Sequence, residues 1–314
     1  MTTAAADARI RSLRPSRHFA DPYQAHGSIV ETERRPDGRV EQAFTLFASG
    51  AECPFTCSFC DLWQWSIDGP TPPGALAHQV ERALGGLDTP RPDRFKFYNA
   101  SNFFDKRAVP TLDANRIAEL TDGFAALTVE SHANTIGPAA IAFAERVNGR
   151  LEVAIGLETI HPVAIKQLNK RLDLARFESA ARLLADNDIE LRAFVLLGAP
   201  YVPAEESIEW TRRTVARAVE CGAAMVSIIP VRGGNGELER LRSLGHFVPP
   251  TLRDLESALD TSAPLSQAVI TADLWDAERL PGCDVCRRAR VERMRRMNIT
   301  GVTLPRITCD ACAS

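Results

Sequence analysis

Three cysteines within eight residues are the strongest chemical signal in this sequence, in the segment Cys53-Pro-Phe-Thr-Cys57-Ser-Phe-Cys60. Soft thiolates bind zinc, copper(I) or iron-sulfur clusters in preference to hard cations. A structural zinc ion usually takes four protein ligands, whereas this group offers three and has no histidine nearby in the sequence. Three cysteines can instead hold three irons of a four-iron cluster and leave the fourth iron open. An open position is what a catalytic metal site needs.

Four further cysteines form two C-x2-C pairs separated by 22 residues, Cys283 with Cys286 and Cys309 with Cys312. Four thiolates make a closed metal site, and paired C-x2-C motifs favour zinc there. Zinc in this position would be structural and would contribute folding energy to a segment with little core of its own. The remaining cysteine, Cys221, has no other cysteine near it in the sequence and is expected to act as a small buried hydrophobic residue.

The composition excludes several classes of protein. The chain has 314 residues, of which 45% are hydrophobic and 25% charged, so a disordered, collagen-like or membrane-spanning chain is not indicated. The net charge of -3 gives no overall attraction to nucleic acid or to anionic lipid. No apolar segment of the signal-peptide type opens the sequence, and the cytoplasm is the expected compartment. In a reducing compartment, closely spaced cysteines indicate metal binding rather than disulfides.

The elements that must position these cysteines follow one repeated pattern of a β-branched or aromatic run, a turn and a helical stretch. The expected strands are 43–48, 94–99, 126–131, 151–158, 190–197 and 223–230, and the expected helices are 74–86, 113–123, 138–148, 162–186 and 204–221. Pro138 and Gly222 stand where a helix start and a helix end are expected. Alternating strands and helices predict parallel βαβ units, either in a doubly wound sheet or in a barrel. In both, ligands gather at the carboxyl ends of the strands.

The first cysteine cluster, placed on the loop after the first of these strands, resembles the motif of the radical S-adenosylmethionine (SAM) superfamily. The match rests on the C-x3-C-x2-C spacing and on Phe59 just before the third cysteine. The resemblance implies a partial (β/α)6 TIM-like barrel over 43–235, between an N-terminal extension (1–42) and a cysteine-rich C-terminal extension (236–314). It also implies a [4Fe-4S] cluster on the three cysteines, with SAM on the open iron. An electron from the cluster would cleave SAM, and the 5′-deoxyadenosyl radical would take hydrogen from a substrate.

Further segments extend the resemblance and imply residues around SAM. Gly156-Leu157-Glu158-Thr159 is similar to the superfamily's fourth-strand pattern, in which an acidic residue helps to hold SAM. The loop over 231–236, in SIIPVRGGNG, is similar to the segment that meets the adenine and includes Arg232 and Asn235. One departure stands at 99–102, where many members have a Gly-Gly-Glu motif. Here Ser101 and Asn102 offer hydroxyl and amide acceptors to an ammonium group without a carboxylate.

Five other polar residues lie near the predicted strand ends. His132 and His161 have side chains suited to acid-base chemistry, but histidines satisfied within the structure are commoner. Asp105, Lys106 and Arg192 are candidates to face the barrel mouth, although the sequence does not orient them.

The substrate is left open between two classes. A softer resemblance, to the branch with the archaeosine-forming tRNA enzyme and the elongator catalytic subunit, implies a modified tRNA base; a small metabolite or natural-product intermediate is the alternative. Residues 283–314 carry seven arginines and a net charge of +4, against -7 for the rest of the chain, which suggests a phosphate-facing patch. A protein of another class, a zinc-ribbon nucleic-acid-binding protein with an inert barrel, is a third interpretation.

The resemblance also bears on the other cofactors and partners. It implies a reductant protein of the flavodoxin or ferredoxin type and no membrane partner. Because many radical SAM enzymes carry an auxiliary [4Fe-4S] cluster in a C-terminal extension, it makes such a cluster the alternative to zinc on the second set of cysteines.

Overall fold

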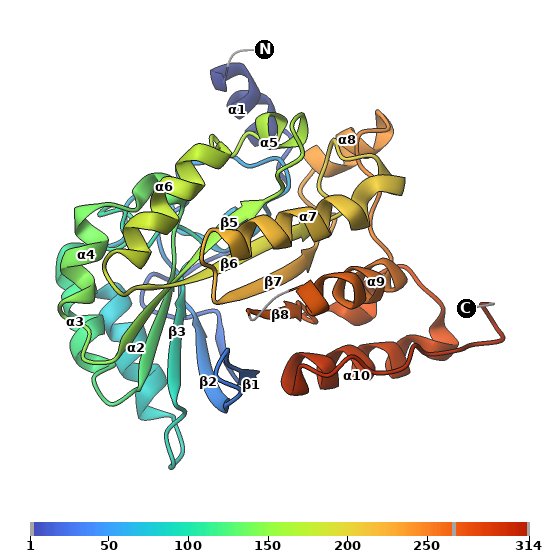
Figure 1. Cartoon of the computed structure of the whole chain (residues 1–314). Helices are drawn as coiled ribbons and strands as arrows, with labels where there is room; N and C mark the ends of the chain where they lie inside the picture. Colours follow the sequence, from blue (N-terminus) through green and yellow to red (C-terminus); the bar gives the residue numbers. More distant parts are fainter. Residues whose placement is uncertain (1–2, 266–267, 313–314) are drawn as a thin grey trace.

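The computed structural model describes residues 3–265 and 268–312 and builds them around one sheet of eight strands (Figure 1). The strands follow one another across the sheet in chain order, and only the first pair is antiparallel. Their bounds are β1 (Gly27–Arg34), β2 (Val40–Phe47), β3 (Arg94–Tyr98), β4 (Ala126–Glu130), β5 (Arg150–Glu158), β6 (Glu190–Leu197), β7 (Met225–Pro230) and β8 (Val269–Ala272).

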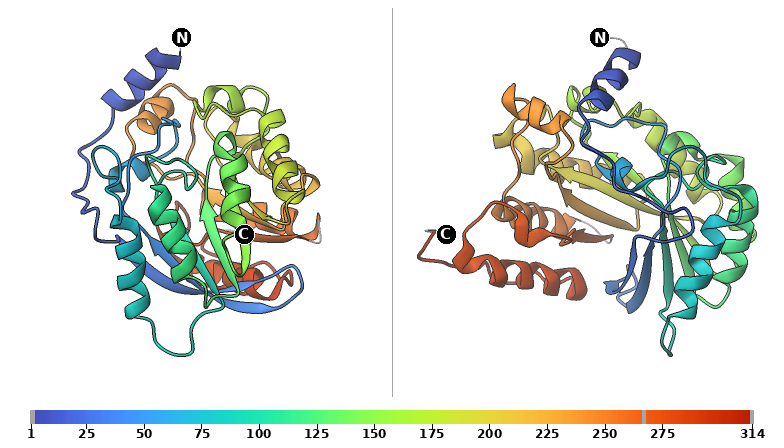
Figure 2. Two further views of the ribbon diagram at one scale, coloured as in Figure 1. Left: turned by 90° about the vertical axis from the view of Figure 1, so that its left-hand side faces the viewer. Right: turned by 180° about the vertical axis from the view of Figure 1, so that it is seen from behind.

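The six predicted strands are confirmed as β2 to β7, and the order of the sheet decides between the two architectures. A doubly wound sheet reverses its strand order part-way. This sheet never reverses, and it curls into a half-barrel with helices on its outer face (Figure 2). The partial TIM-like barrel is therefore the fold.

The sheet extends beyond residues 43–235 at both ends. β1, from the N-terminal extension, runs antiparallel to β2, and β8, from the C-terminal extension, runs parallel to β7. β1 was missed because its side chains are polar and largely exposed, and β8 because it has only four residues.

The helices alternate with the strands as predicted, with one correction. Their bounds are α1 (Thr3–Ser12), α2 (Ala75–Gly85), α3 (Thr111–Leu120), α4 (Pro138–Ala144), α5 (Ala164–Gln167), α6 (Leu174–Ala185), α7 (Ser207–Glu220), α8 (Glu237–Ser243), α9 (Leu252–Ser262) and α10 (Asp284–Thr300). Pro138 begins α4, and Gly222, with φ of 92°, follows α7. The helix expected over 162–186 was wrong, because it is broken between α5 and α6, where Asn169 and Arg171 take positive φ values of 55° and 58°.

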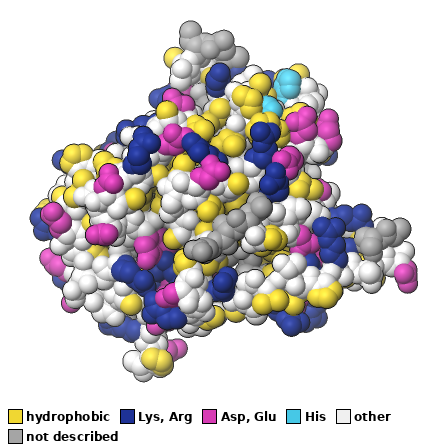
Figure 3. All heavy atoms as spheres, in the orientation of Figure 1, with side chains coloured by type: hydrophobic (Ala, Val, Ile, Leu, Met, Phe, Trp, Pro, Cys, Tyr) yellow, Lys and Arg dark blue, Asp and Glu magenta, His cyan; other side chains and the backbone are white. Residues whose placement is uncertain are grey.

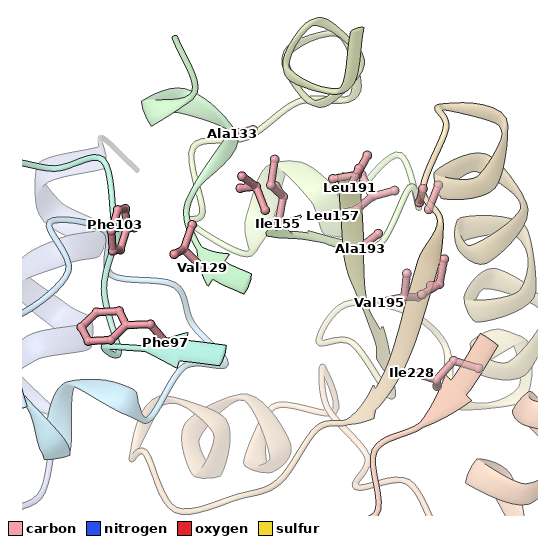
Figure 4. Close-up of a cluster of buried hydrophobic side chains, with 14 of the residues drawn as sticks. Phe97, Phe103, Val129, Ala133, Ile155, Leu157, Leu191, Ala193, Val195 and Ile228 are labelled. Atoms are coloured by element: carbon pink, nitrogen blue, oxygen red, sulfur yellow. The ribbon is translucent and has the colours of Figure 1, made fainter. Parts of the chain in front are cut away.

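The hydrophobic core lies between the sheet and its helices (Figure 4). Phe97, Val129, Ile155, Val195 and Ile228 come from five successive parallel strands, and none of these side chains is accessible to solvent. These side chains form the apolar face that each strand turns toward the covering helices.

A layer of buried charges fills the opposite end of the barrel from the cysteines. Arg192, near the start of β6, donates hydrogen bonds to Glu152 of β5 at 2.6 Å and to Glu33 of β1 at 2.9 Å. Lys96 of β3 also pairs with Glu33. These strands are not all neighbours, so the contacts cross the inside of the curved sheet. Arg192 therefore lies at the floor of the barrel and not at its mouth.

Within the described ranges, no helix has the length and apolar character needed to cross a membrane.

Candidate functional site

The three clustered cysteines lie on the loop after β2, at the carboxyl ends of the parallel strands. Loops from elsewhere in the chain hold this segment from two sides. Ser58 N donates to the carbonyl of Leu168, after β5, at 2.9 Å. Asn235 Nδ2, after β7, donates to the carbonyl of Ser58 at 2.9 Å and to that of Cys60 at 3.3 Å. The loop is thus fixed by residues 110 or more positions away in sequence, as a preorganised ligand set requires.

The thiols of this loop are ionisable groups in a poorly solvated place. Burial raises the pKa of Cys53, raises that of Cys57 to about 12 and raises that of Cys60 well above its usual value. Without a metal the three groups are neutral thiols. A soft metal centre that binds them must displace their protons, so cluster binding here is coupled to proton release. Asn102 Nδ2 lies 3.4 Å from Cys53 Sγ and supports one ligand directly.

Glu158, at the end of β5, forms a buried ion pair with Lys170 beside the cysteine loop. Lys170 Nζ lies 2.7 Å from Glu158 Oε1 and 5.9 Å from the centre of the Phe59 ring. Glu158 has a φ of 66° at a register shift in the pairing of β5 with β6, a strained conformation typical of functional sites. Gly156 allows this approach, because a Cβ there would stand 1.9 Å from Glu158 Oε1.

Unpartnered polar groups stand at the end of β3. Asn99 is inaccessible to solvent, and neither its Oδ1 nor its Nδ2 has a hydrogen-bond partner. Ser101 Oγ is buried in the same way. Orphaned buried polar atoms cost stability, and a polar ligand would satisfy them.

Glu130, at the end of β4, provides a carboxylate next to these groups. Its Oε1 accepts hydrogen bonds from the backbone N–H groups of Asn99 at 3.0 Å and Ala100 at 2.9 Å. Burial raises the pKa of Glu130 to about 7. The loop that lacks the Gly-Gly-Glu carboxylate is therefore held against a carboxylate from the neighbouring strand.

The other residues expected around SAM are brought to the same end of the barrel but are already engaged. Asn102 Oδ1 accepts from His132 N at 2.8 Å. Asn235 Oδ1 accepts from Leu238 N at 2.8 Å, so its amide braces the cysteine loop on one side and α8 on the other. Arg232 pairs with Asp273, beyond β8, at 3.1 Å. Of the five predicted positions, Ser101 and Glu158 offer the most to a ligand.

The two histidines have structural partners. His132 Nδ1 accepts from Asn134 N at 3.0 Å, which makes Nε2 the N–H that donates to the Lys170 carbonyl at 2.9 Å. Burial lowers the pKa of His132 to about 3, so this histidine stays neutral while its ring stacks on Phe55. His161 Nδ1 accepts from Ala164 N at 3.1 Å, near the start of α5.

Asp105 and Lys106, the acidic and the basic candidate after β3, make no contact with the cysteine loop among the contacts of the described residues. Asp105 accepts from Arg107 N within its own turn at 2.9 Å, and Lys106 is exposed.

Helix α1 fastens the loops around the cysteines. The Asp7 carboxylate accepts hydrogen bonds from Thr56 Oγ1, within the cysteine loop, at 2.5 Å and from Asn169 Nδ2 at 2.8 Å. Arg9 pairs with the buried Glu237 of α8 at 3.0 Å. One short helix thus connects the loops after β2, β5 and β7 (Figure 1).

The four C-terminal cysteines converge on one point. Their sulfur atoms all lie within 4.8 Å of one another, although the two pairs are separated by α10 and the returning chain. Cys283 Sγ lies 4.0 Å from Cys309 Sγ, and Cys286 Sγ lies 3.8 Å from Cys312 Sγ. The structure therefore brings the two C-x2-C pairs together as one candidate metal site.

The arginines of this segment are largely neutralised by neighbouring carboxylates. Arg290 and Arg293 are buried and pair with Glu256 of α9. Three more pair with aspartate or glutamate: Arg287 with Asp284, Arg295 with Glu292 and Arg306 with Asp260. Arg288 and Arg296 are the two of the seven for which the described part of the chain records no ion pair. Asp284 and Glu292 are already counted in the net charge of +4, so the carboxylates from outside the segment that offset this charge are Glu256 and Asp260.

Comparison with solved structures identifies the fold. Methylornithine synthase (PylB) superposes with a TM-score of 0.53 at 13% identity, over 92% of this chain and 74% of PylB. A radical SAM methyltransferase from Sphaerobacter thermophilus gives 0.50 at 15% identity, over 81% and 76%. The chain has the radical SAM fold. Elp3 from the archaeon Methanocaldococcus infernus also has this fold, with a TM-score of 0.50 at 13% identity over 72% of this chain, which spans 59% of that Elp3. At the sequence level, no family model and no curated protein matches the chain.

Within the radical SAM fold, two site residues escaped the sequence analysis. Glu130 is the last-but-one residue of the predicted strand 126–131, and its position near a strand end was a usable signal. Lys170 was assigned to a helix interior, and only the break between α5 and α6 carries its side chain back to Glu158.

Proposed function

We propose that this chain is a radical SAM enzyme whose catalytic [4Fe-4S] cluster is held by Cys53, Cys57 and Cys60. The observation that carries the proposal is the meeting, at the carboxyl ends of the strands, of three soft ligands with unsatisfied buried polar groups on the next loop. Three thiolates suit three irons of a cluster and leave the fourth open to a cosubstrate.

The surrounding residues suit the amino-acid portion of SAM. Asn99 Oδ1 and Ser101 Oγ are acceptors for its ammonium group, and the Glu130 carboxyl group lies behind them, where a bound ammonium group would favour its ionised form. Lys170, close to Cys57 and Glu158, is the cation available for its carboxylate. When bound, the cluster and SAM together supply a 5′-deoxyadenosyl radical that abstracts hydrogen from a substrate. The protein orients the two cofactors and keeps water away from them.

A modified tRNA base is the substrate class that we favour, on the basis of the sequence resemblance to the archaeosine and elongator branch. The surface of the C-terminal segment adds little support, because five of its seven arginines are paired. On the face shown in Figure 3, basic and acidic side chains are interspersed. A small metabolite or natural-product intermediate is the second candidate. A steep salt dependence of bulk tRNA binding that is lost in an Arg288→Ala, Arg296→Ala variant would favour tRNA; salt-independent or absent binding would favour the metabolite.

The cofactor assignment is tested by reconstituting the protein anaerobically and measuring iron, sulfide and SAM binding. The Cys57→Ala variant should lose the cluster's brown absorbance and its SAM binding together. Cys221→Ala is the matched control and should leave both readouts unchanged, because Cys221 lies between the end of α7 and the start of β7, at the opposite end of the strands from this loop. Zinc without iron in the purified wild-type protein would instead support a zinc-ribbon protein with an inert barrel. A reductant protein of the flavodoxin or ferredoxin type would supply the electron.

A further inference from the structure

The four C-terminal cysteines have the spacing of ligands to a single metal ion. In a tetrahedral site the distance between two ligands is about 1.6 times the metal–ligand distance, so a Zn–S bond of about 2.3 Å requires sulfurs about 3.8 Å apart. The observed contacts are 4.0 Å for Cys283 with Cys309 and 3.8 Å for Cys286 with Cys312. The four sulfurs therefore already outline one tetrahedron.

We propose that Cys283, Cys286, Cys309 and Cys312 bind one zinc ion, and that this ion fastens the C-terminal segment to the barrel. An auxiliary [4Fe-4S] cluster would require a wider arrangement. Its four cysteines bind four different irons, so the sulfurs must surround a cube of iron and sulfide and cannot converge on one point. A closed set of four thiolates around a single ion is the pattern of structural zinc.

The surroundings of the sulfurs favour a negatively charged centre. Cys283 caps the N-terminus of the 17-residue helix α10 and Cys286 lies in its first turn, where the helix dipole stabilises thiolates. Arg290 Nε donates to Cys286 Sγ at 3.1 Å, and Arg253 Nη2 lies 3.8 Å from Cys312 Sγ. Zinc with four thiolates carries a formal charge of -2, and these two guanidinium groups offset it.

The same residues join the site to the barrel. Arg290 also pairs with Glu256 of α9, which is itself buried. α10 packs against α9, β8 and β1, so it covers the side of the half-barrel where the first and last strands do not pair.

The returning segment 301–312 has no regular secondary structure. Its backbone is held by Arg293, which donates to the carbonyl of Pro305 at 2.8 Å, and by Arg290, which donates to that of Ile307 at 3.3 Å. A metal ion at its end adds a further attachment to these hydrogen bonds.

The experiment measures zinc and iron per chain in holoenzyme purified anaerobically, in three forms of the full chain. The wild type should hold about one zinc and about four irons. Cys309→Ser should lose the zinc and keep the iron, and Cys221→Ser should keep both. If Cys309→Ser does not fold, Cys57→Ala answers the same question, because it should lose the iron and keep the zinc. This zinc result stands even if the catalytic cluster assignment fails.

Three outcomes would overturn the proposal. About eight irons per chain without zinc would assign an auxiliary cluster to the second site. One iron beyond the catalytic cluster, lost in Cys309→Ser, would make the ion iron instead of zinc. A wild-type protein with neither zinc nor additional iron would mean that the four thiols hold no metal.

Discussion

Replacing Asn99 with alanine should weaken SAM binding without destabilising the protein. A buried polar group without a partner costs about 1–3 kcal/mol, and Asn99 carries two such atoms. Its removal should leave the stability of the cluster-free protein unchanged or raise it, because no hydrogen bond is lost and only a small cavity is created. In the loaded enzyme, losing a hydrogen bond to the charged ammonium of SAM costs about 1.5–3 kcal/mol, so SAM should bind about ten- to a hundredfold more weakly.

Asn102→Ala is the matched control, because it makes the same chemical change three residues away. Asn102 Oδ1 accepts from the buried His132 N, so its removal orphans that donor and should cost about 1–3 kcal/mol. Urea denaturation of the two cluster-free variants gives the stability difference, and equilibrium dialysis of SAM with loaded Asn99→Ala gives the affinity. If Asn99→Ala loses more than about 1 kcal/mol of unfolding free energy while SAM affinity stays within about twofold of wild type, Asn99 has a structural role and does not bind SAM.

Three further predictions follow from individual contacts. Asp7→Asn should loosen the cysteine loop and speed the loss of iron in air, which is measured as the decay of the cluster absorbance. An unchanged rate would show that α1 does not stabilise the loop. Glu130 has a pKa of about 7 in the native state and about 4.5 in the unfolded chain, so the native state binds its proton more tightly. The contribution of this group to the free energy of unfolding is therefore fully present below pH 4.5 and is lost as the pH rises to about 7. Glu130→Gln should abolish this dependence, up to about 3 kcal/mol, in urea melts at pH 5 and 8. Glu256→Gln should lower the free energy of unfolding by about 3–5 kcal/mol, since it removes a buried negative charge that Arg290 and Arg293 share, although Arg293 keeps its pair with Asp260. Glu292→Gln, in an exposed pair, should cost under about 1 kcal/mol.

The sequence was a good guide to the strands that both faces of the fold bury. β2 to β7 are rich in β-branched and aromatic residues because each buries an apolar face against the helices. β1 gave no such signal, because its Glu33 forms ion pairs with Lys96 and Arg192, which lie on strands far along the chain. The break between α5 and α6 was equally hidden, since it depends on backbone strain and not on a proline or glycine.

The candidate site divides in the same way. The cysteines form local motifs, and their spacing indicated both candidate metal sites. Lys170 and Glu130 make their contacts only when β3, β4 and β5 lie side by side, so these contacts depend on the tertiary fold and not on local sequence. Asn235 and Arg232 were placed at the correct end of the barrel, but the partners that occupy their side chains could not be read from residue types.

Above all, we propose that this protein cleaves SAM at an iron-sulfur cluster held by Cys53, Cys57 and Cys60. The most direct measurement is the formation of 5′-deoxyadenosine from SAM by the anaerobically reconstituted protein with a chemical reductant. The wild type and Cys221→Ala should form 5′-deoxyadenosine, and Cys57→Ala should form none. Equal 5′-deoxyadenosine formation by Cys57→Ala, or none by a wild-type protein with its full complement of iron, would contradict it.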